Sequence, residues 1–166
     1  DKICLLMGGG EGLLPMEEII TALKNMELKN LRIVALTGKN DSLAKSLMKK
    51  FTDVEVLGFT DKVTQLMCGA DIIISKAGGV SSSEILASNL DYIIYKPLPG
   101  QEENNAKFLA THYGASIANN VENIKEVVAN FCENDDKEKI YMKEVLGRPN
   151  ASKEVCEFVF ARLKNI

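Results

Sequence analysis

The chain has 166 residues, of which 46% are hydrophobic and 26% charged, and its 20 basic and 23 acidic side chains give a formal net charge of −3. The apolar fraction excludes a disordered chain, and 12 glycines and 4 prolines without a fixed period exclude a collagen-like one. The near balance of charge provides no general attraction for nucleic acid, so we expect no nucleic-acid partner. No apolar run approaches the roughly 18 residues of a membrane-spanning helix.

Short apolar runs alternate with stretches of helical periodicity through the first 120 residues. The runs of strand length are residues 3–7, 31–36, 54–57, 72–74, 92–95 and, more weakly, 115–118. Helical patterns fill the gaps at residues 13–26, 42–50, 63–67, 85–90 and 106–112. Continuous apolar runs are typical of strands that are buried on both faces. The pattern therefore predicts an α/β fold, a doubly wound parallel sheet of about six strands with helices on both faces.

The pattern becomes entirely helical after residue 119. Helices are predicted at residues 121–131, 137–146 and 152–163, with Gly147 as the stop of the second. We therefore expect one domain over residues 1–166, with an α/β core at 1–120 and a helical tail at 121–166. In the last helix, Val155, Phe158, Val159 and Phe160 predict a stripe that faces the core. Membrane contact is the alternative, because the basic residues Lys153, Arg162 and Lys164 lie beside this stripe.

Metal and disulfide chemistry has little support in the sequence. Cys4, Cys68, Cys132 and Cys156 are scattered, and His112 is the single histidine, whereas a structural zinc site needs clustered ligands. The apolar neighbours of the cysteines predict small buried side chains in a reducing compartment. We expect His112 on a helix surface.

A first glycine loop, Gly8-Gly9-Gly10-Glu11-Gly12, connects the first predicted strand to a helix. Such a turn lets backbone N–H groups approach an anion at the positive end of the helix. The spacing does not match the dinucleotide fingerprint, and Thr37-Gly38-Lys39-Asn40 replaces the acidic residue expected after the second strand. A dehydrogenase is therefore disfavoured, and a tight turn without a ligand remains the alternative.

A second glycine loop precedes another helical pattern, in the segment from Gly78 and Gly79 through Val80 and three serines to Glu84. Glycines and hydroxyls at a helix N-terminus also form an anion cradle. The alternative is a capping box, in which Glu84 closes onto the backbone of Ser81. Because both loops follow strands of one sheet, we expect them to flank a crevice at the strands' carboxyl ends.

A polar segment follows the fifth predicted strand, where Pro97-Leu98-Pro99-Gly100 breaks the chain before Gln101 begins a helix. Gln101 and Asn105 are four residues apart and so share one helix face. Amide and carboxylate groups offer the donors and acceptors that suit sugar hydroxyls. Glu103, by contrast, is expected to complement the helix dipole and to pair with Lys107.

Together these segments resemble the C-terminal, nucleotide-sugar-binding half of a GT-B glycosyltransferase, which has a Rossmann-like fold. The similar group contains the MurG-type transferases and the monogalactosyldiacylglycerol synthases, and in particular the processive diacylglycerol glucosyltransferases. The resemblance covers residues 3–120 and is carried by segments 6–12, 58–60, 75–84 and 97–106. The last two segments, at their mutual spacing, are the specific ones.

The resemblance implies a role for each matched residue. The diphosphate would lie near Gly9, Gly10, Gly12, Gly79, Val80 and Ser81. The uridine would contact Phe59, Thr60 and Glu84, whose carboxylate can accept hydrogen bonds from both ribose hydroxyls. The hexose would be held by Gln101, Glu102 and Asn105. MurG-type proteins have two glutamines where this chain has Gln101-Glu102, which favours an unmodified hexose over N-acetylglucosamine.

The resemblance also implies the reaction, in which an acceptor hydroxyl attacks the anomeric carbon with inversion and UDP departs. The sequence has no DxD triplet, so we expect neither a metal nor another cofactor, and helix N-termini would stabilise the departing diphosphate. The implied general base belongs to an N-terminal acceptor-binding domain that this sequence lacks. We therefore expect a UDP-hexose-binding domain that is inactive alone. In the whole enzyme, glucose or galactose would pass to a lipid such as diacylglycerol, in the cytoplasm, with peripheral membrane association through the N-terminal domain.

Three other functions remain open. The first is a UDP-N-acetylglucosamine-dependent transferase or epimerase, although an epimerase should carry more ionisable groups than Glu84 and Glu102. The second is a non-catalytic UDP-sugar-binding subunit that needs a separate membrane partner. The third is a nucleotide-binding module without a role for the sugar.

Overall fold

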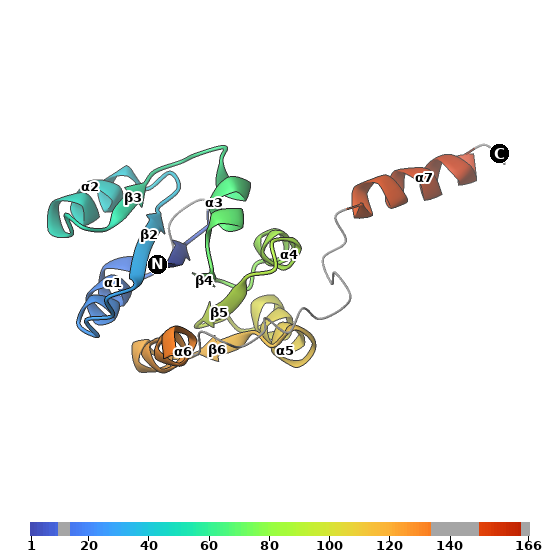
Figure 1. Ribbon diagram of the computed structural model, residues 1–166. Coiled ribbons are helices and arrows are strands. Elements are labelled where there is room, and N and C mark those ends of the chain that lie inside the picture. The colour runs from blue at the N-terminus through green and yellow to red at the C-terminus, as the bar shows by residue number, and fades with distance from the viewer. Residues whose placement is uncertain (10–13, 134–149, 164–166) are drawn as a thin grey trace.

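The computed structural model describes residues 1–9, 14–133 and 150–163, and its centre is one parallel six-stranded sheet (Figure 1). The strand order is β3-β2-β1-β4-β5-β6, and every neighbouring pair is parallel. The strands are β1 (Lys2–Met7), β2 (Leu31–Leu36), β3 (Glu55–Leu57), β4 (Ile72–Ser75), β5 (Asp91–Tyr95) and β6 (Ser116–Ala118). All six predicted strands are confirmed, including the weak one at the end of the core.

Helices cover both faces of the sheet. Successive strand residues point to opposite faces, so each strand contributes side chains to both cores. Cys4 and Leu6 of β1 pack with α1 (Met16–Lys24), α2 (Asp41–Lys50) and α6 (Val121–Glu133). Leu5 and Met7 pack on the other side with α3 (Val63–Gly69), α4 (Gly79–Ala87) and α5 (Gln101–Tyr113). The predicted doubly wound α/β fold is therefore confirmed.

Two helix boundaries show where apolar periodicity is a weak signal. The helix predicted from residue 85 begins at Gly79 instead. The prediction placed the start too late because the first turns of the helix are rich in glycine and serine, and the helix buries only Ser82 and Ile85. Helix α5 begins at Gln101, where the polar segment indicated a start. The helix predicted at 137–146 and the stop at Gly147 lie outside the described residues.

The last helix, α7 (Ala151–Leu163), corrects the prediction of a core-facing stripe. Val155, Phe158, Val159 and Phe160 are all exposed, with between 46% and 63% of their surface accessible. None of the residues of α7 is buried against the part of the chain that the structure describes. No helix within the described residues is both long enough and apolar enough to cross a bilayer.

The four cysteines range from buried to exposed, and Cys132 is intermediate. Cys4 on β1 is fully buried, and this burial raises the pKa of its thiol to about 12. Cys68 and Cys156 are exposed, so the prediction that the cysteines are buried is wrong for these two. Apolar neighbours in the sequence do not decide burial on a helix, because adjacent residues there face different directions.

Candidate functional site

The candidate site lies where the chain reverses its direction of travel across the sheet. β2 and β3 extend the sheet on one side of β1, whereas β4 to β6 extend it on the other. Met7 at the end of β1 is directly paired with Ser75 at the end of β4. The two glycine loops therefore leave neighbouring strands at the carboxyl edge, as expected. In open α/β sheets, ligands bind at such a switch point.

The first glycine loop begins with a backbone conformation that favours glycine. Gly9 has a φ of +73°, and a Cβ added there would meet no atom within 4 Å, so the requirement is conformational rather than steric. Gly8 is buried and Gly9 is exposed. Gly10 and Gly12 lie outside the described residues, so the loop's expected diphosphate contacts stay a prediction.

The second glycine loop ends in a helix start without a side-chain cap. Gly78 precedes α4 in an extended conformation, and the first bond of the helix runs from the Ser82 N–H to the Gly78 carbonyl oxygen at 2.9 Å. The backbone N–H groups of Gly79, Val80 and Ser81 thus precede the first intrahelical bond. Such N–H groups, at the positive end of a helix, form the chemistry of an anion site.

The capping box that the serine run suggested does not form. Ser81 lies inside the first turn of α4 instead of preceding it, because the helix begins at Gly79. Glu84 lies in the middle of the helix and is exposed. Its carboxylate is therefore not used to cap α4.

Three side chains bind backbone carbonyl oxygens around the switch point. The Ser75 hydroxyl donates to the Met7 carbonyl at 2.8 Å. The Tyr92 hydroxyl donates to the Lys76 carbonyl at 2.6 Å, and the Asn105 amide donates to the Ala77 carbonyl at 2.9 Å. Sequence reasoning missed Ser75 and Tyr92, since each looked like an ordinary strand residue.

The hydroxyl of Tyr92 is protonated at neutral pH and is available as a donor. Burial raises the pKa of Tyr92 to about 12, although a hydrogen bond with Ser82 acts in the opposite direction. The Ser82 hydroxyl is itself buried and lies 3.4 Å from the tyrosine oxygen. The two side chains join α4 to β5 below the second glycine loop.

Lysine side chains add positive charge at this edge of the sheet. The Lys76 ammonium donates to the Lys96 carbonyl at 2.5 Å, which links the loops that follow β4 and β5. The Lys96 ammonium lies 5.1 Å from the centre of the Tyr95 ring. Lys76 and Lys96 directly follow β4 and β5. This position after a strand could have predicted from the sequence that they lie at the carboxyl edge of the sheet.

The polar segment after β5 forms the start of α5. Gln101 is the first residue of the helix and is exposed, whereas Glu102 is half-buried. A carboxylate oxygen of Glu102 accepts a hydrogen bond from the Leu98 N–H at 2.9 Å, so part of this group is used to hold the preceding turn. The predicted ion pair of Glu103 with Lys107 is confirmed at 3.0 Å.

The residues expected to contact uracil follow β3. Phe59 is 71% exposed, and the Lys39 ammonium lies 5.8 Å from the centre of its ring. The Thr60 hydroxyl accepts a hydrogen bond from the Lys62 N–H at 3.1 Å. β3 is two strands from β1, a separation of about 10 Å at the usual strand spacing. The structure thus brings Gly9, Gly79, Val80, Ser81 and Asn105 to the switch point, with Phe59 and Thr60 further along the same edge.

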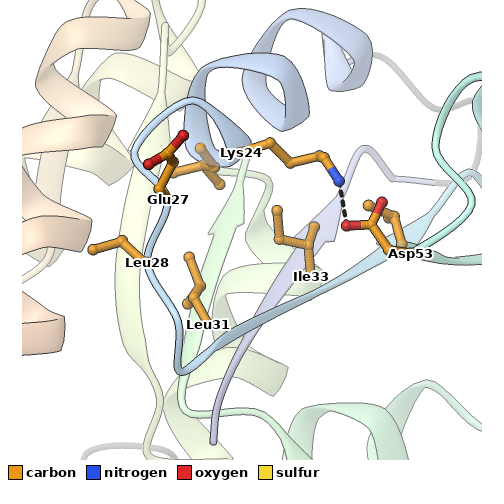
Figure 2. A pocket seen from close by; sticks show the side chains of 8 residues that line it. Lys24, Glu27, Leu28, Leu31, Ile33 and Asp53 are labelled. Atoms are coloured by element: carbon orange, nitrogen blue, oxygen red, sulfur yellow. Dashed lines mark hydrogen bonds and ion pairs between the residues drawn. The ribbon is translucent and has the colours of Figure 1, made fainter.

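Two hollows lie away from this edge. The first, of about 210 Å³, is at the amino end of β2, where Lys24 pairs with Asp53 above Leu31 and Ile33 (Figure 2). The hydrogen bond from Lys24 holds the pKa of the Asp53 carboxyl below its usual value. Because this hollow is lined by no predicted site residue, we treat it as separate from the candidate site.

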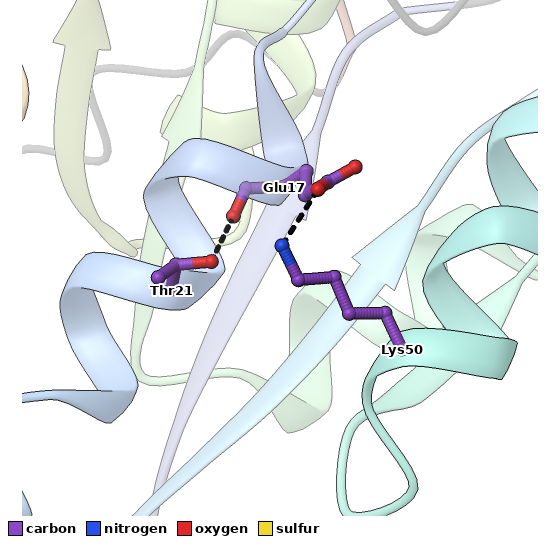
Figure 3. Close-up of polar contacts among 3 residues, drawn as sticks. All are labelled: Glu17, Thr21 and Lys50. Atoms are coloured by element: carbon purple, nitrogen blue, oxygen red, sulfur yellow. Dashed lines mark hydrogen bonds and ion pairs between the residues drawn. The ribbon is translucent and has the colours of Figure 1, made fainter.

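The second hollow, of about 410 Å³, is lined by residues of α1, by Lys50 of α2 and by the start of α6. The Lys50 ammonium there lies 2.7 Å from a carboxylate oxygen of Glu17, and the Thr21 hydroxyl donates to the Glu17 carbonyl at 2.7 Å (Figure 3). The exposed ion pair of Lys50 with Glu17 joins α2 to α1, whereas the Thr21 bond lies within α1. They contain no residue of the candidate site.

The described residues contain no group of three or more histidine, cysteine or acidic side chains that could hold a metal ion. His112 is exposed on α5, with its ring 4.5 Å from that of Phe108. Its predicted position on a helix surface is confirmed.

A six-stranded parallel sheet with helices on both faces and a switch point between β1 and β4 places the chain in the class of doubly wound α/β domains, whose ligands bind at that point. Residues 3–155 match the family model of the glycosyltransferase family 28 C-terminal domain, and the chain belongs to this family. It is 30% identical to a processive diacylglycerol beta-glucosyltransferase of Bacillus cytotoxicus, over 95% of this chain and 42% of the relative. It is 33% identical to the protein of the same description from Bacillus pumilus, over 82% of this chain and 36% of the relative. The chain therefore spans less than half the length of these relatives.

Solved structures of glycosyltransferases have the same fold. The structure of MurG from Acinetobacter baumannii matches with a TM-score of 0.75 and 21% identity, over 96% of this chain and 49% of that one. Medicago truncatula UGT71G1, solved in complex with UDP-glucose, matches with a TM-score of 0.61 and 15% identity, over 87% of this chain and 34% of that one. The predicted fold, that of the C-terminal half of GT-B glycosyltransferases, is confirmed.

Proposed function

We propose that this domain binds a UDP-hexose at the carboxyl edge of β1 and β4, as the donor-binding part of an inverting glycosyltransferase. The complete enzyme transfers glucose or galactose to a lipid acceptor such as diacylglycerol. The names of the curated relatives, processive diacylglycerol beta-glucosyltransferases, support this acceptor class and favour glucose. The chain spans 42% of the length of the first of these relatives, so the acceptor site is assigned to a separate N-terminal domain.

The observation that carries the proposal is the uncapped start of α4 beside the end of β1. Three successive N–H groups, from Gly79, Val80 and Ser81, are available to the oxygens of a diphosphate. Glu84 follows on the same helix, where its exposed carboxylate can accept hydrogen bonds from the ribose hydroxyls. Phe59 and Thr60 contact the uracil, and Gln101, Glu102 and Asn105 contact the hexose. Gly9, Gly10 and Gly12 complete the diphosphate site.

In the proposed reaction, the acceptor hydroxyl oxygen forms a bond to the anomeric carbon of the hexose. The bond from that carbon to the diphosphate oxygen breaks, and its electron pair leaves with UDP. A base from the N-terminal domain takes the hydroxyl proton. The positive end of α4 stabilises the charge that grows on the diphosphate, so the reaction needs no metal ion or cofactor.

Calorimetric titration of the chain with UDP and ADP tests the uridine assignment. We expect a clear preference for UDP, because the uracil contacts distinguish the two bases, and no preference would overturn the proposal. Titration with UDP-glucose, UDP-galactose and UDP-N-acetylglucosamine then separates the candidate donors. Tightest binding of UDP-N-acetylglucosamine would favour the alternative transferase or epimerase. A UDP-hexose that binds no tighter than UDP would favour a plain nucleotide-binding module.

A turnover assay tests whether this chain binds the donor but needs the N-terminal domain for transfer. We expect the chain alone to bind UDP-glucose without transferring glucose to diacylglycerol vesicles, because the base and the acceptor site belong to the N-terminal domain. That domain also provides the peripheral membrane contact, on the cytoplasmic side. Transfer by the chain alone would contradict this assignment.

A further inference from the structure

Three carbonyl oxygens at the switch point accept hydrogen bonds from side chains. The Met7 carbonyl ends β1, and the Lys76 and Ala77 carbonyls belong to the second glycine loop. Their donors, Ser75, Tyr92 and Asn105, come from β4, β5 and α5. The three donors are far apart in the sequence and meet only at this edge of the sheet.

The environment of the donors shows which way the carbonyls point. Ser75 is 2% exposed and Tyr92 is 6% exposed, so both hydroxyls lie inside the protein. Asn105 is half-buried on α5, and the Ala77 residue that it binds is fully buried. The carbonyl oxygens of Met7, Lys76 and Ala77 are therefore directed inward, away from the solvent-facing side of the loops.

The direction of these carbonyls matters for an anion. A carbonyl oxygen carries partial negative charge and repels a diphosphate, whereas an N–H group attracts it. In a peptide unit the two groups point in opposite directions, so the N–H that follows a fixed carbonyl is directed away from the hydrogen-bond donor of that carbonyl. The amide that follows Ala77 is that of Gly78, which is half-buried and lies immediately before the uncapped start of α4. The amide that follows Lys76 belongs to Ala77, which is fully buried, so there the bond from Tyr92 fixes the carbonyl alone.

We propose that Ser75, Tyr92 and Asn105 are positioning residues of the donor site, which hold three carbonyl oxygens away from the diphosphate. The partial negative charge of these carbonyls is then directed away from the ligand, and the Gly78 N–H toward it, before the ligand binds, so no reorganisation is needed. This inference rests on the proposed function. It gives Asn105 a task that is independent of the hexose.

The test compares UDP with uridine, which lacks the phosphates, by calorimetric titration of the whole chain. In Tyr92→Phe and Asn105→Ala we expect the affinity for UDP to fall roughly three- to tenfold, the effect of one typical hydrogen bond. The affinity for uridine should not change. The matched controls are Tyr113→Phe and Asn104→Ala, which make the same chemical changes on α5 at positions that bind neither loop. Both controls should keep the affinities of the original chain for both ligands.

The outcomes separate the inference from the proposed function. If the original chain binds UDP no tighter than uridine, the diphosphate site is wrong and the inference fails with it. If the original chain prefers UDP and both variants retain the full preference, the inference alone is overturned. Unfolding curves of each variant measure any loss of stability. In a purely structural role, a less stable variant would bind both UDP and uridine more weakly. That result would also overturn the inference.

Discussion

The sequence left two interpretations of Glu84 open, a helix cap and a ribose contact, and the structure decides against the first. As the last residue of a capping box it would belong to the folding of α4, whereas as a ribose ligand it would belong to the site. The helix begins five residues before it, and its carboxylate is exposed. The capping interpretation is therefore wrong, and the proposed ribose contact is the interpretation that remains for this side chain.

We predict that Glu84→Ala weakens UDP binding by about 1–3 kcal/mol, the usual value of hydrogen bonds to a charged group. The free energy of unfolding should change by less than about 0.5 kcal/mol, because the side chain is exposed and caps nothing. Calorimetry and urea unfolding measure the two quantities, with Glu126→Ala on the surface of α6 as the control. Normal UDP affinity in Glu84→Ala would contradict the ribose assignment.

Tyr92 makes the stability of the domain sensitive to alkaline pH. Burial raises its pKa from 10.0 to about 12, so the unfolded chain loses the phenolic proton first as pH rises. Between these values the unfolded state binds fewer protons than the folded state, and the free energy of unfolding falls with increasing pH. The contribution of Tyr92 is fully present below pH 10 and is lost by about pH 12.

We expect Tyr92→Phe to remove part of this alkaline slope, by up to about 1.4 kcal/mol per pH unit. Urea unfolding of both proteins between pH 9 and 11.5 provides the measurement. Tyr113→Phe, which changes the tyrosine at the C-terminal end of α5, is the control. Parallel pH profiles for the original chain and Tyr92→Phe would show that the Tyr92 hydroxyl titrates normally.

At the scale of elements, the sequence predicted the buried strands. It missed the start of α4 and the hydrogen bonds to the loop carbonyls, which depend on the direction of the backbone. The strands were found because each is a continuous apolar run, and a parallel sheet covered on both faces requires such runs. The start of α4 was placed too late, since a helix that opens with glycines and serines has no apolar period to reveal it. The bonds from Tyr92 and Asn105 to the loop carbonyls depend on how each peptide unit is turned, and no spacing in the sequence encodes this.

Helix α7 is the element whose apolar residues remain exposed. We predict that Phe158→Ala, at a position that is 62% exposed, changes the free energy of unfolding by less than about 0.5 kcal/mol. Ile124→Ala on α6, where the side chain is fully buried, should cost about 2–5 kcal/mol. Urea unfolding compares the two variants. A cost for Phe158→Ala as large as that for Ile124→Ala would contradict the exposed position of α7.

At the scale of the whole molecule, length alone suggested a complete domain, whereas the comparisons relate it to part of a longer enzyme. A sequence of 166 residues can fold around its own core, and the structure has cores on both faces of its sheet. The candidate site nevertheless lies open at one edge of that sheet. The resemblance in the polar segments predicted the relation to glycolipid synthases that the comparisons confirm, and it is the source of the proposed donor. General patterning could not have supplied either.

We predict that UDP stabilises the domain without a metal ion. A ligand at a concentration one hundred times its Kd raises the free energy of unfolding by about 2.7 kcal/mol. This gain should survive EDTA, because the helix start and the loop N–H groups provide the positive end of the site. Thermal unfolding with UDP, with and without EDTA, measures it. A gain that disappears in EDTA and returns with Mg²⁺ would contradict metal-independent binding.

The strand order also determines when the proposed nucleotide site can first form during synthesis. The paired residues Met7 and Ser75, which end the two central strands, are 68 positions apart in the sequence, and β2 and β3 are made between them. During synthesis, β1, β2 and β3 leave the ribosome first, with the first glycine loop but without the second. The second loop is placed when β4 inserts beside β1, a non-local pairing of the kind that slows folding. We therefore expect the proposed nucleotide binding to require a completed sheet, so that a chain stalled before β4 would not bind UDP.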